Sequence, residues 1–182
     1  GQSFFDRREI RDMMAYLKAI DNPRDEVSLL RIINIPARGI GESSTEKILQ
    51  SAVKNGTSFW EVSEQMAEAG TVSAKTRTAL SQFRGLLSRY AATMHERPTE
   101  LASLTRSLLQ EINYESEIEK QYKEETQREV RRNILEEFVS SIGLYAEKKP
   151  RPTLSGFLES MALLDREEES DRGEEKQQDA VR

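Results

Sequence analysis

Apolar residues recur at intervals of three and four positions along nearly the whole chain, which is the spacing of helices that bury one face. No stretch alternates apolar and polar residues as a half-buried strand does. The 182 residues include only 9 glycines and 5 prolines, too few for the many turns of an all-β fold. The sequence therefore predicts an all-α fold. The predicted helices cover approximately residues 6–21, 25–34, 43–55, 58–69, 73–95, 98–111, 113–122, 127–147 and 153–164.

Two short patterns predict where helices begin. Ser43 followed by Glu46, and Ser58 followed by Glu61, each match a capping box. In this motif the serine side chain accepts a bond from the helix backbone, and the glutamate side chain bonds the serine N–H in return. We therefore expect Ser43 and Ser58 to cap the third and fourth predicted helices.

Prolines and charge mark the segments between and after the helices. Pro23 and Pro36 end the first two helices, because proline disfavours helical backbone in the residue before it. Residues 149–152, with the sequence Lys-Pro-Arg-Pro, predict a rigid, extended linker. Residues 165–178 are acidic and nearly free of apolar side chains, so we expect this tail to be mobile.

The composition excludes several kinds of active site. The absence of cysteine rules out disulfides, thiolate zinc sites and cysteine nucleophiles, and His95 is the only histidine available for a metal centre or a Ser–His triad. The sequence contains no glycine-rich nucleotide-binding motif and no distinct acid–base pair of carboxylates. We predict no catalytic residue, no metal site and no cofactor in this chain. With no apolar run near the roughly 18 residues of a membrane span, and no signal-peptide pattern, we expect a soluble, cytoplasmic protein without membrane contact.

The formal net charge of −5 is unevenly distributed. Residues 165–182 hold 8 acidic and 4 basic side chains, which leaves residues 1–164 nearly neutral. Residues 71–95 contain four basic side chains and no acidic one. Such a stretch could line a DNA phosphate backbone, and the alternative is an ordinary solvated helix face. The four residues are Lys75, Arg77, Arg84 and Arg89.

The most informative local pattern is Arg38-Gly39-Ile40-Gly41, placed between two predicted helices. Two glycines permit a tight turn with positive φ, and the following helix N-terminus offers unpaired N–H groups and positive dipole charge. Together they could seat a DNA phosphate, with Arg38 as an added cation, as in helix–hairpin–helix modules. The alternative is a plain helix–helix turn with Ile40 as its core plug. Trp60 could stack on a base, although a core position is the ordinary role for such a residue.

The chain opens with GQSFFDRREIRD, and Arg38-Gly39-Ile40-Gly41 follows later. These and several other segments, in an order that covers most of the chain, resemble superfamily 1 DNA helicases of the UvrD/Rep/PcrA type, whose glycine motif is known as GIG. Residues 57–125 carry no matching motif. The matching segments are residues 1–12, 15–17, 22–23, 31–36, 38–41, 46–48, 132–138, 153–158, 162–164 and 178–182.

The resemblance implies an inserted helical subdomain, called 2B, of the second RecA-like motor domain. Residues 1–21 would be a remnant of the motor, residues 22–164 the 2B subdomain, and residues 165–182 an acidic flexible linker back to the motor. The parent would be an ATP-dependent 3′→5′ DNA helicase of repair or replication that uses ATP and Mg. The Walker motifs and the arginine finger are absent here, so we expect no ATP hydrolysis by this chain.

In the resembling family, 2B swivels, contacts duplex DNA ahead of the motor and restrains activity. The implied partners are duplex DNA, the single-strand/duplex junction and the rest of the motor, without sequence readout. The alternative is a protein-interaction module that recruits a DNA-repair protein. We expect the opening helix, separated from its motor, to be free or repacked. The expected DNA-binding residues are Arg38, Gly39, Ile40, Gly41, Glu42, Ser43, Ser44, Thr45 and Lys47, followed by Lys75, Arg77, Arg84, Arg89, Phe5 and Arg7.

Overall fold

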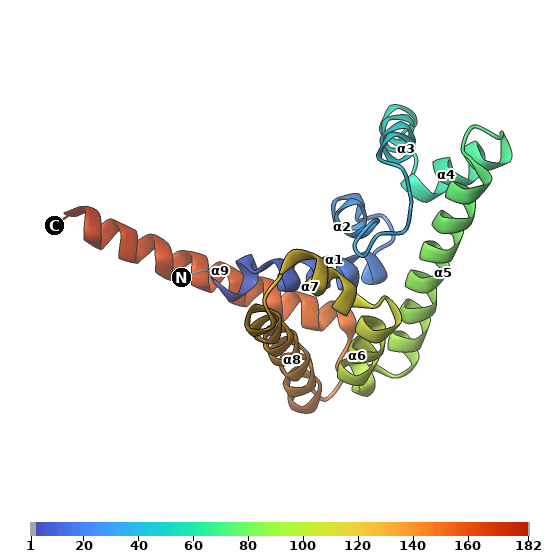
Figure 1. The fold of residues 1–182 in the computed structure, drawn as a ribbon. Coiled ribbons are helices and arrows are strands. Elements are labelled where there is room, and N and C mark those ends of the chain that lie inside the picture. Colours follow the sequence, from blue (N-terminus) through green and yellow to red (C-terminus); the bar gives the residue numbers. More distant parts are fainter. Residues whose placement is uncertain (1–2, 182) are drawn as a thin grey trace.

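The computed structural model describes residues 3–181, and over that range its regular structure is entirely helical, which confirms the all-α prediction (Figure 1). Gly1, Gln2 and Arg182, at the ends of the predicted motor remnant and linker, lie outside the described residues. The helices are η1 (Phe4–Asp6), α1 (Arg8–Asp21), α2 (Glu26–Ile32), α3 (Glu42–Asn55), α4 (Phe59–Glu68), α5 (Ala74–Glu96), η2 (Pro98–Glu100), α6 (Leu101–Glu111), α7 (Tyr114–Gln121), α8 (Glu125–Lys148) and α9 (Leu154–Val181).

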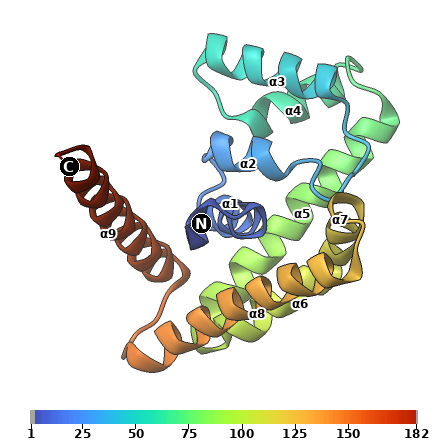
Figure 2. The same ribbon diagram turned by 60° about the vertical axis from the view of Figure 1, so that its left-hand side comes forward.

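Helix α5 is the long spine of the molecule. Figures 1 and 2 show α3 and α4 together at one end of α5, and α6 and α8 at its other end. Helix α1 lies between these two groups and packs against α2, α5, α8 and α9. The turn between α2 and α3 is thereby held between the central helix and the upper end of the spine.

Helix α1 supplies the centre of the hydrophobic core. Ile10, Met13, Tyr16 and Leu17 have no exposed surface, and they recur at the helical spacing that the sequence predicts. Phe59 and Trp60 begin α4, and Trp60 packs against Phe83 with the ring centroids 6.2 Å apart. The opening helix is therefore packed into this chain and not free, and the expected core position of Trp60 is confirmed.

A buried ionic network fixes α1 to its neighbours. The Asp12 carboxylate is fully buried, and it accepts a hydrogen bond of 2.7 Å from the Tyr114 hydroxyl of α7. The Nη2 atom of Arg31, from α2, lies 3.0 Å from the other carboxylate oxygen of Asp12. One turn earlier, Glu9 accepts from the Tyr122 hydroxyl at 2.7 Å. Buried carboxylates need such partners, so this network specifies how α1, α2 and α7 meet.

The two predicted capping boxes have different outcomes. Ser58 and Glu61 form both bonds of the motif, so that prediction is confirmed. Helix α3 begins earlier than predicted, with Gly41 as its N-cap and no side-chain cap, so the prediction for Ser43 is wrong. Gly41 is extended and its carbonyl oxygen accepts from the Thr45 N–H at 3.0 Å, which places Ser43 inside the first helical turn.

This difference yields a matched pair of stability predictions. Replacing Ser58 with alanine should lower the free energy of unfolding by about 1 kcal/mol, because the helix loses a side-chain cap. Replacing Ser43 with alanine should change it by less than about 0.5 kcal/mol, because Ser43 is an exposed position without a cap bond. Urea unfolding of both variants checks the pair, and equal losses would contradict the assignment of Gly41 as the N-cap.

The C-terminal segment differs from the mobile tail that its composition predicts. Helix α9 continues through this segment to Val181, and its outer half extends beyond the body of the molecule (Figures 1 and 2). Glu, Gln, Lys and Arg are good helix formers, so a polar composition does not oppose a helix. The Arg172 guanidinium also pairs with Asp6 at 3.0 Å, and Ser3 bonds Glu168, which holds η1 alongside α9. The linker at residues 149–152 contains no helix, as predicted.

Candidate nucleic-acid interface

The turn between α2 and α3 is built around the side chain of Asn34. Its amide nitrogen donates to the Ile40 carbonyl oxygen at 2.7 Å, and its amide oxygen accepts from the Ile40 N–H at 3.2 Å. The same oxygen accepts from the Arg38 N–H at 3.4 Å. Ile40 itself is 3% exposed and fills the core below the turn. The Asn34 carboxamide therefore holds the segment over the buried side chain of Ile40. Ile40 fills the core, as the alternative interpretation of this motif predicts.

The two glycines of the motif have different roles. Gly39 has φ of +74°, a region that residues with a side chain rarely adopt, so glycine is required there by conformation. Gly41 has φ of −63° and ψ of 139°, which any residue can adopt, and serves as the N-cap of α3. The sharp reversal at Gly39 turns the chain so that α3 begins immediately afterwards at the surface.

The start of α3 presents unpaired donors to solvent. Within residues 3–181, the backbone N–H groups of Glu42, Ser43 and Ser44 donate to no acceptor, as expected for a first helical turn without a side-chain cap. Glu42 and Ser43 are exposed, and Ser44 is half-buried. The Thr45 hydroxyl donates back to the Gly41 carbonyl at 3.0 Å. These N–H groups and the helix dipole form a seat of the right chemistry for a phosphate oxygen.

Arg38 does not take the outward position that the sequence interpretation gives it. Its Nη1 atom lies 2.8 Å from the Ile32 carbonyl oxygen, and its Nη2 atom donates to the Tyr16 hydroxyl at 2.6 Å. The guanidinium also lies over the Phe83 ring, 4.3 Å from its centroid. The arginine is therefore engaged inside the turn, because the end of α2 and two aromatic rings surround it.

Tyr16 completes this arrangement from α1. Its hydroxyl accepts from Arg38 and donates to the Ile35 carbonyl oxygen, so it bridges the guanidinium and the loop backbone. Burial raises the pKa of the Tyr16 hydroxyl above its usual value, and the guanidinium beside it opposes that rise in part. The phenol therefore keeps its proton at neutral pH and remains a donor.

Lys75 is the basic side chain that the fold brings to the turn. A Cβ added at Gly39 would lie 3.6 Å from the Cε atom of Lys75, which comes from the first turn of α5. Lys75 is exposed. Lys47, in the second turn of α3, is also exposed. Gly39, the start of α3 and Lys75 thus form one surface, which we call the turn surface.

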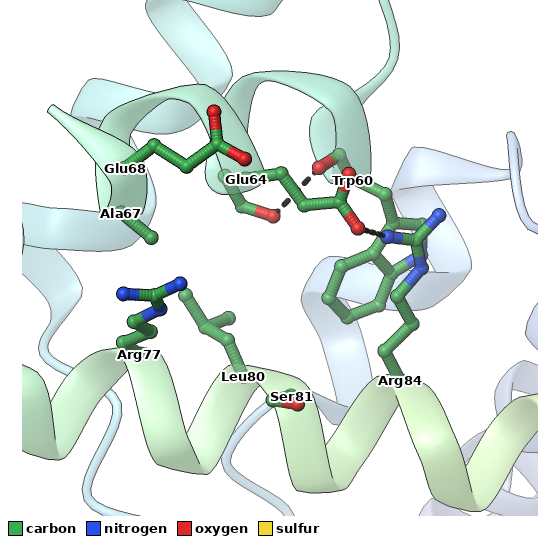
Figure 3. A pocket seen from close by; sticks show the side chains of 9 residues that line it. Trp60, Glu64, Ala67, Glu68, Arg77, Leu80, Ser81 and Arg84 are labelled. Atoms are coloured by element: carbon green, nitrogen blue, oxygen red, sulfur yellow. Dashed lines mark hydrogen bonds and ion pairs between the residues drawn. The ribbon is translucent and has the colours of Figure 1, made fainter.

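The remaining basic residues of α5 follow a different pattern. Arg84 pairs with Glu64 of α4 and lies over the Trp60 ring, 5.6 Å from the ring centroid. Figure 3 shows this pair at the edge of a shallow cavity of about 310 Å³, which Arg77 also lines. Two acidic residues, Glu64 and Glu68, line the same cavity. A stretch without acids in the sequence is therefore not a uniformly basic face in the fold.

Arg89 is also paired. Its guanidinium makes two bonds to the Glu111 carboxylate of α6, at 2.9 and 3.1 Å, and these bonds raise the pKa of Arg89 further. Phe5 and Arg7 lie far from the turn in the chain, at η1 and the start of α1, and both are half-buried. His95 is exposed near the end of α5. The turn surface therefore gathers only part of the expected DNA-binding set.

The residues that shape the turn were not identified as site residues from the sequence. In the sequence, Asn34, Tyr16 and Phe83 are members of predicted helices. Their joint action depends on contacts between residues that are 4 to 45 positions apart. An asparagine at the end of a predicted helix and two residues before Pro36 was the one local signal, because asparagine side chains often bond nearby backbone.

Among residues 3–181, no group of three or more His, Asp or Glu side chains is placed to hold a metal ion. None of the helices in that range is both long enough and apolar enough to cross a membrane.

Comparison with known proteins defines the class. The UvrD-like helicase C-terminal domain family matches residues 1–179, so the chain belongs to that family. Similar proteins include the ATP-dependent DNA helicase PcrA of Bacillus subtilis, 35% identical over 175 residues, which is 96% of this chain. The PcrA helicases of Staphylococcus epidermidis and Staphylococcus aureus are each 31% identical over 173 residues, or 94% of the chain. The chain spans 23% of the length of these relatives.

Proposed function

We propose that this chain is the 2B subdomain of an ATP-dependent 3′→5′ DNA helicase, which contacts duplex DNA and regulates the motor. The relatives are ATP-dependent DNA helicases, which supports a helicase parent. The observation that supports contact with DNA is the exposed start of α3, which follows the positive-φ turn at Gly39. Lys75 lies beside this turn. ATP and Mg would act in the motor, outside this chain.

The proposed contact uses backbone chemistry. A phosphate oxygen accepts from the unpaired N–H groups of residues 42–44, and Lys75 adds a cation at the side of Gly39. Backbone phosphate contacts fix position without reading bases, so we expect binding to depend little on sequence. Glu42 carries a like charge, and its exposed side chain can extend into solvent away from the seat.

The proposed organisation keeps the boundaries of the sequence interpretation. Residues 1–21 belong to the motor, residues 22–164 form 2B, and residues 165–182 return to the motor. Helix α1 packs against α2 and α5. This packing supports a rigid junction between the motor and 2B, through which α1 would transmit forces. Partners of the whole protein would be the single-strand/duplex junction, the motor and a repair protein, in the cytoplasm.

The test is binding of this chain to a fluorescent hairpin duplex with a 3′ single-stranded tail, measured at several salt concentrations. Gly39→Ala should weaken binding about tenfold, since a distorted seat loses at least one charge-assisted hydrogen bond. Lys75→Ala should reduce the slope of log affinity against log salt by about 0.9, the value for one phosphate contact.

A matched control separates strain from DNA contact. Gly56, at the other end of α3, has φ of +64°, and a Cβ added there meets no atom within 4 Å. Gly56→Ala should destabilise the fold by about 1–2 kcal/mol, as Gly39→Ala does, and should leave DNA affinity unchanged. Equal losses of affinity in both variants would refute the seat. No binding at low salt would favour a protein partner and direct the next experiment to a pull-down.

A further inference from the structure

The guanidinium of Arg38 is surrounded by acceptors of its own chain. Its Nη1 atom lies 2.8 to 3.4 Å from the carbonyl oxygens that end α2 and begin the loop, and its Nη2 atom donates to Tyr16. Carbonyl groups at the end of a helix carry partial negative charge, which favours a cation there. These carbonyl oxygens belong to Ile32, Ile33, Ile35 and Pro36.

Two aromatic rings from different helices complete the enclosure. The guanidinium carbon lies 4.3 Å from the centroid of the Phe83 ring and 5.7 Å from that of the Tyr16 ring. Phe83 is 1% exposed and Tyr16 has no exposed surface, so both rings are fixed by the core. A cation above such rings is attracted by their π-electrons. Arg38 therefore joins the loop to α1 and α5 at once.

We infer that Arg38 is a positioning residue: it fixes the phosphate seat against α1 and α5 and does not itself contact DNA. This inference rests on the proposed function of the turn surface and names how that surface is held. Gly39 directly follows Arg38, so the contacts of the guanidinium hold the residue next to the reversal that leads into α3. Because α1 is the proposed motor segment, Arg38 also links the DNA contact to the motor side.

Lysine cannot replace this side chain. The planar guanidinium donates in several directions in one plane and lies over the Phe83 ring, whereas an ammonium is a compact point charge. A direct phosphate contact, by contrast, needs only a cation, and lysine would preserve it. Arg38→Lys therefore distinguishes positioning from contact. Tyr16→Phe is the second variant, because it removes the bridging hydroxyl at a residue that DNA cannot reach.

The experiment uses the whole chain with Arg38→Lys, Arg38→Ala, Tyr16→Phe, the Arg38→Lys/Tyr16→Phe double variant and Lys75→Ala. DNA affinity, its salt slope and amide hydrogen exchange over residues 39–45 are measured for each. Arg38→Lys should weaken DNA binding about tenfold with an unchanged salt slope, and Tyr16→Phe should weaken it in the same direction. The double variant should bind about as weakly as Arg38→Lys alone, because both changes break one network.

Hydrogen exchange gives a readout that does not need DNA. Exchange of the hydrogen-bonded amides of Ile40 and Thr45 should accelerate in both Arg38→Lys and Tyr16→Phe, and should be unchanged in Lys75→Ala. If Arg38→Lys binds like the unsubstituted chain, or if Arg38→Ala lowers the salt slope by about 0.9 while Tyr16→Phe is neutral, Arg38 is a DNA ligand and the inference fails. If the unsubstituted chain binds no DNA, the proposed function fails, and unchanged exchange in both variants would still overturn the positioning role.

Discussion

Replacing Phe138 with alanine is expected to lower the free energy of unfolding by about 3–5 kcal/mol. Phe138 has no exposed surface and lies on α8, where its ring meets that of Phe157 edge to face with the centroids 6.0 Å apart. Alanine would remove the ring and leave a cavity between α8 and α9 that neighbouring side chains cannot fill. Urea unfolding followed by circular dichroism measures the loss.

The same helix provides the control for this prediction. Val130 lies on α8 and is 54% exposed, so Val130→Ala should change the free energy of unfolding by less than about 0.5 kcal/mol. Phe138→Leu should cost less than Phe138→Ala because it leaves a smaller cavity. A loss below about 1 kcal/mol for Phe138→Ala would mean that α9 does not depend on this contact.

The second large effect is expected at Asp12, whose replacement with alanine should cost about 3 kcal/mol. Asp12 is fully buried, and the change leaves the Tyr114 hydroxyl, on a residue only 2% exposed, without its acceptor. Arg31 loses its ion pair as well, although it is partly exposed and water can solvate it. Burial raises the pKa of the Asp12 carboxyl, while Tyr114 and Arg31 oppose that rise, so these partners support the charged form.

Two further variants make the Asp12 measurement specific. Asp12→Asn keeps the shape of the side chain and one of its two acceptor oxygens, so it should cost less than Asp12→Ala in urea unfolding. Asp171→Ala removes an exposed carboxylate from the outer half of α9 and should be nearly neutral. If Asp12→Ala and Asp171→Ala unfolded at the same urea concentration, the network would not hold α1 to α2 and α7.

The sequence by itself determined where most of the helices lie along the chain. The helical periodicity, the stop at Pro23 and the capping box at Ser58 each involve residues within about four positions of one another, so their physics is local. The core position of Trp60 is also predictable from nearby residues, because Trp60 lies in the first turn of an amphipathic helix and faces the core. The glycine motif was also recognisable, since positive φ at Gly39 is a requirement on a single residue.

Tertiary structure alone decided where the long cationic side chains point. Arg84 and Arg89 pair with Glu64 and Glu111, which lie on other helices, so an acid-free stretch of sequence did not become a basic face. The guanidinium of Arg38 points into the turn because the carbonyl oxygens at the end of α2 and the Phe83 ring surround it. A flexible side chain pairs with whatever groups the fold places within its reach. Those groups come from distant parts of the chain, so spacing along the sequence could not reveal them.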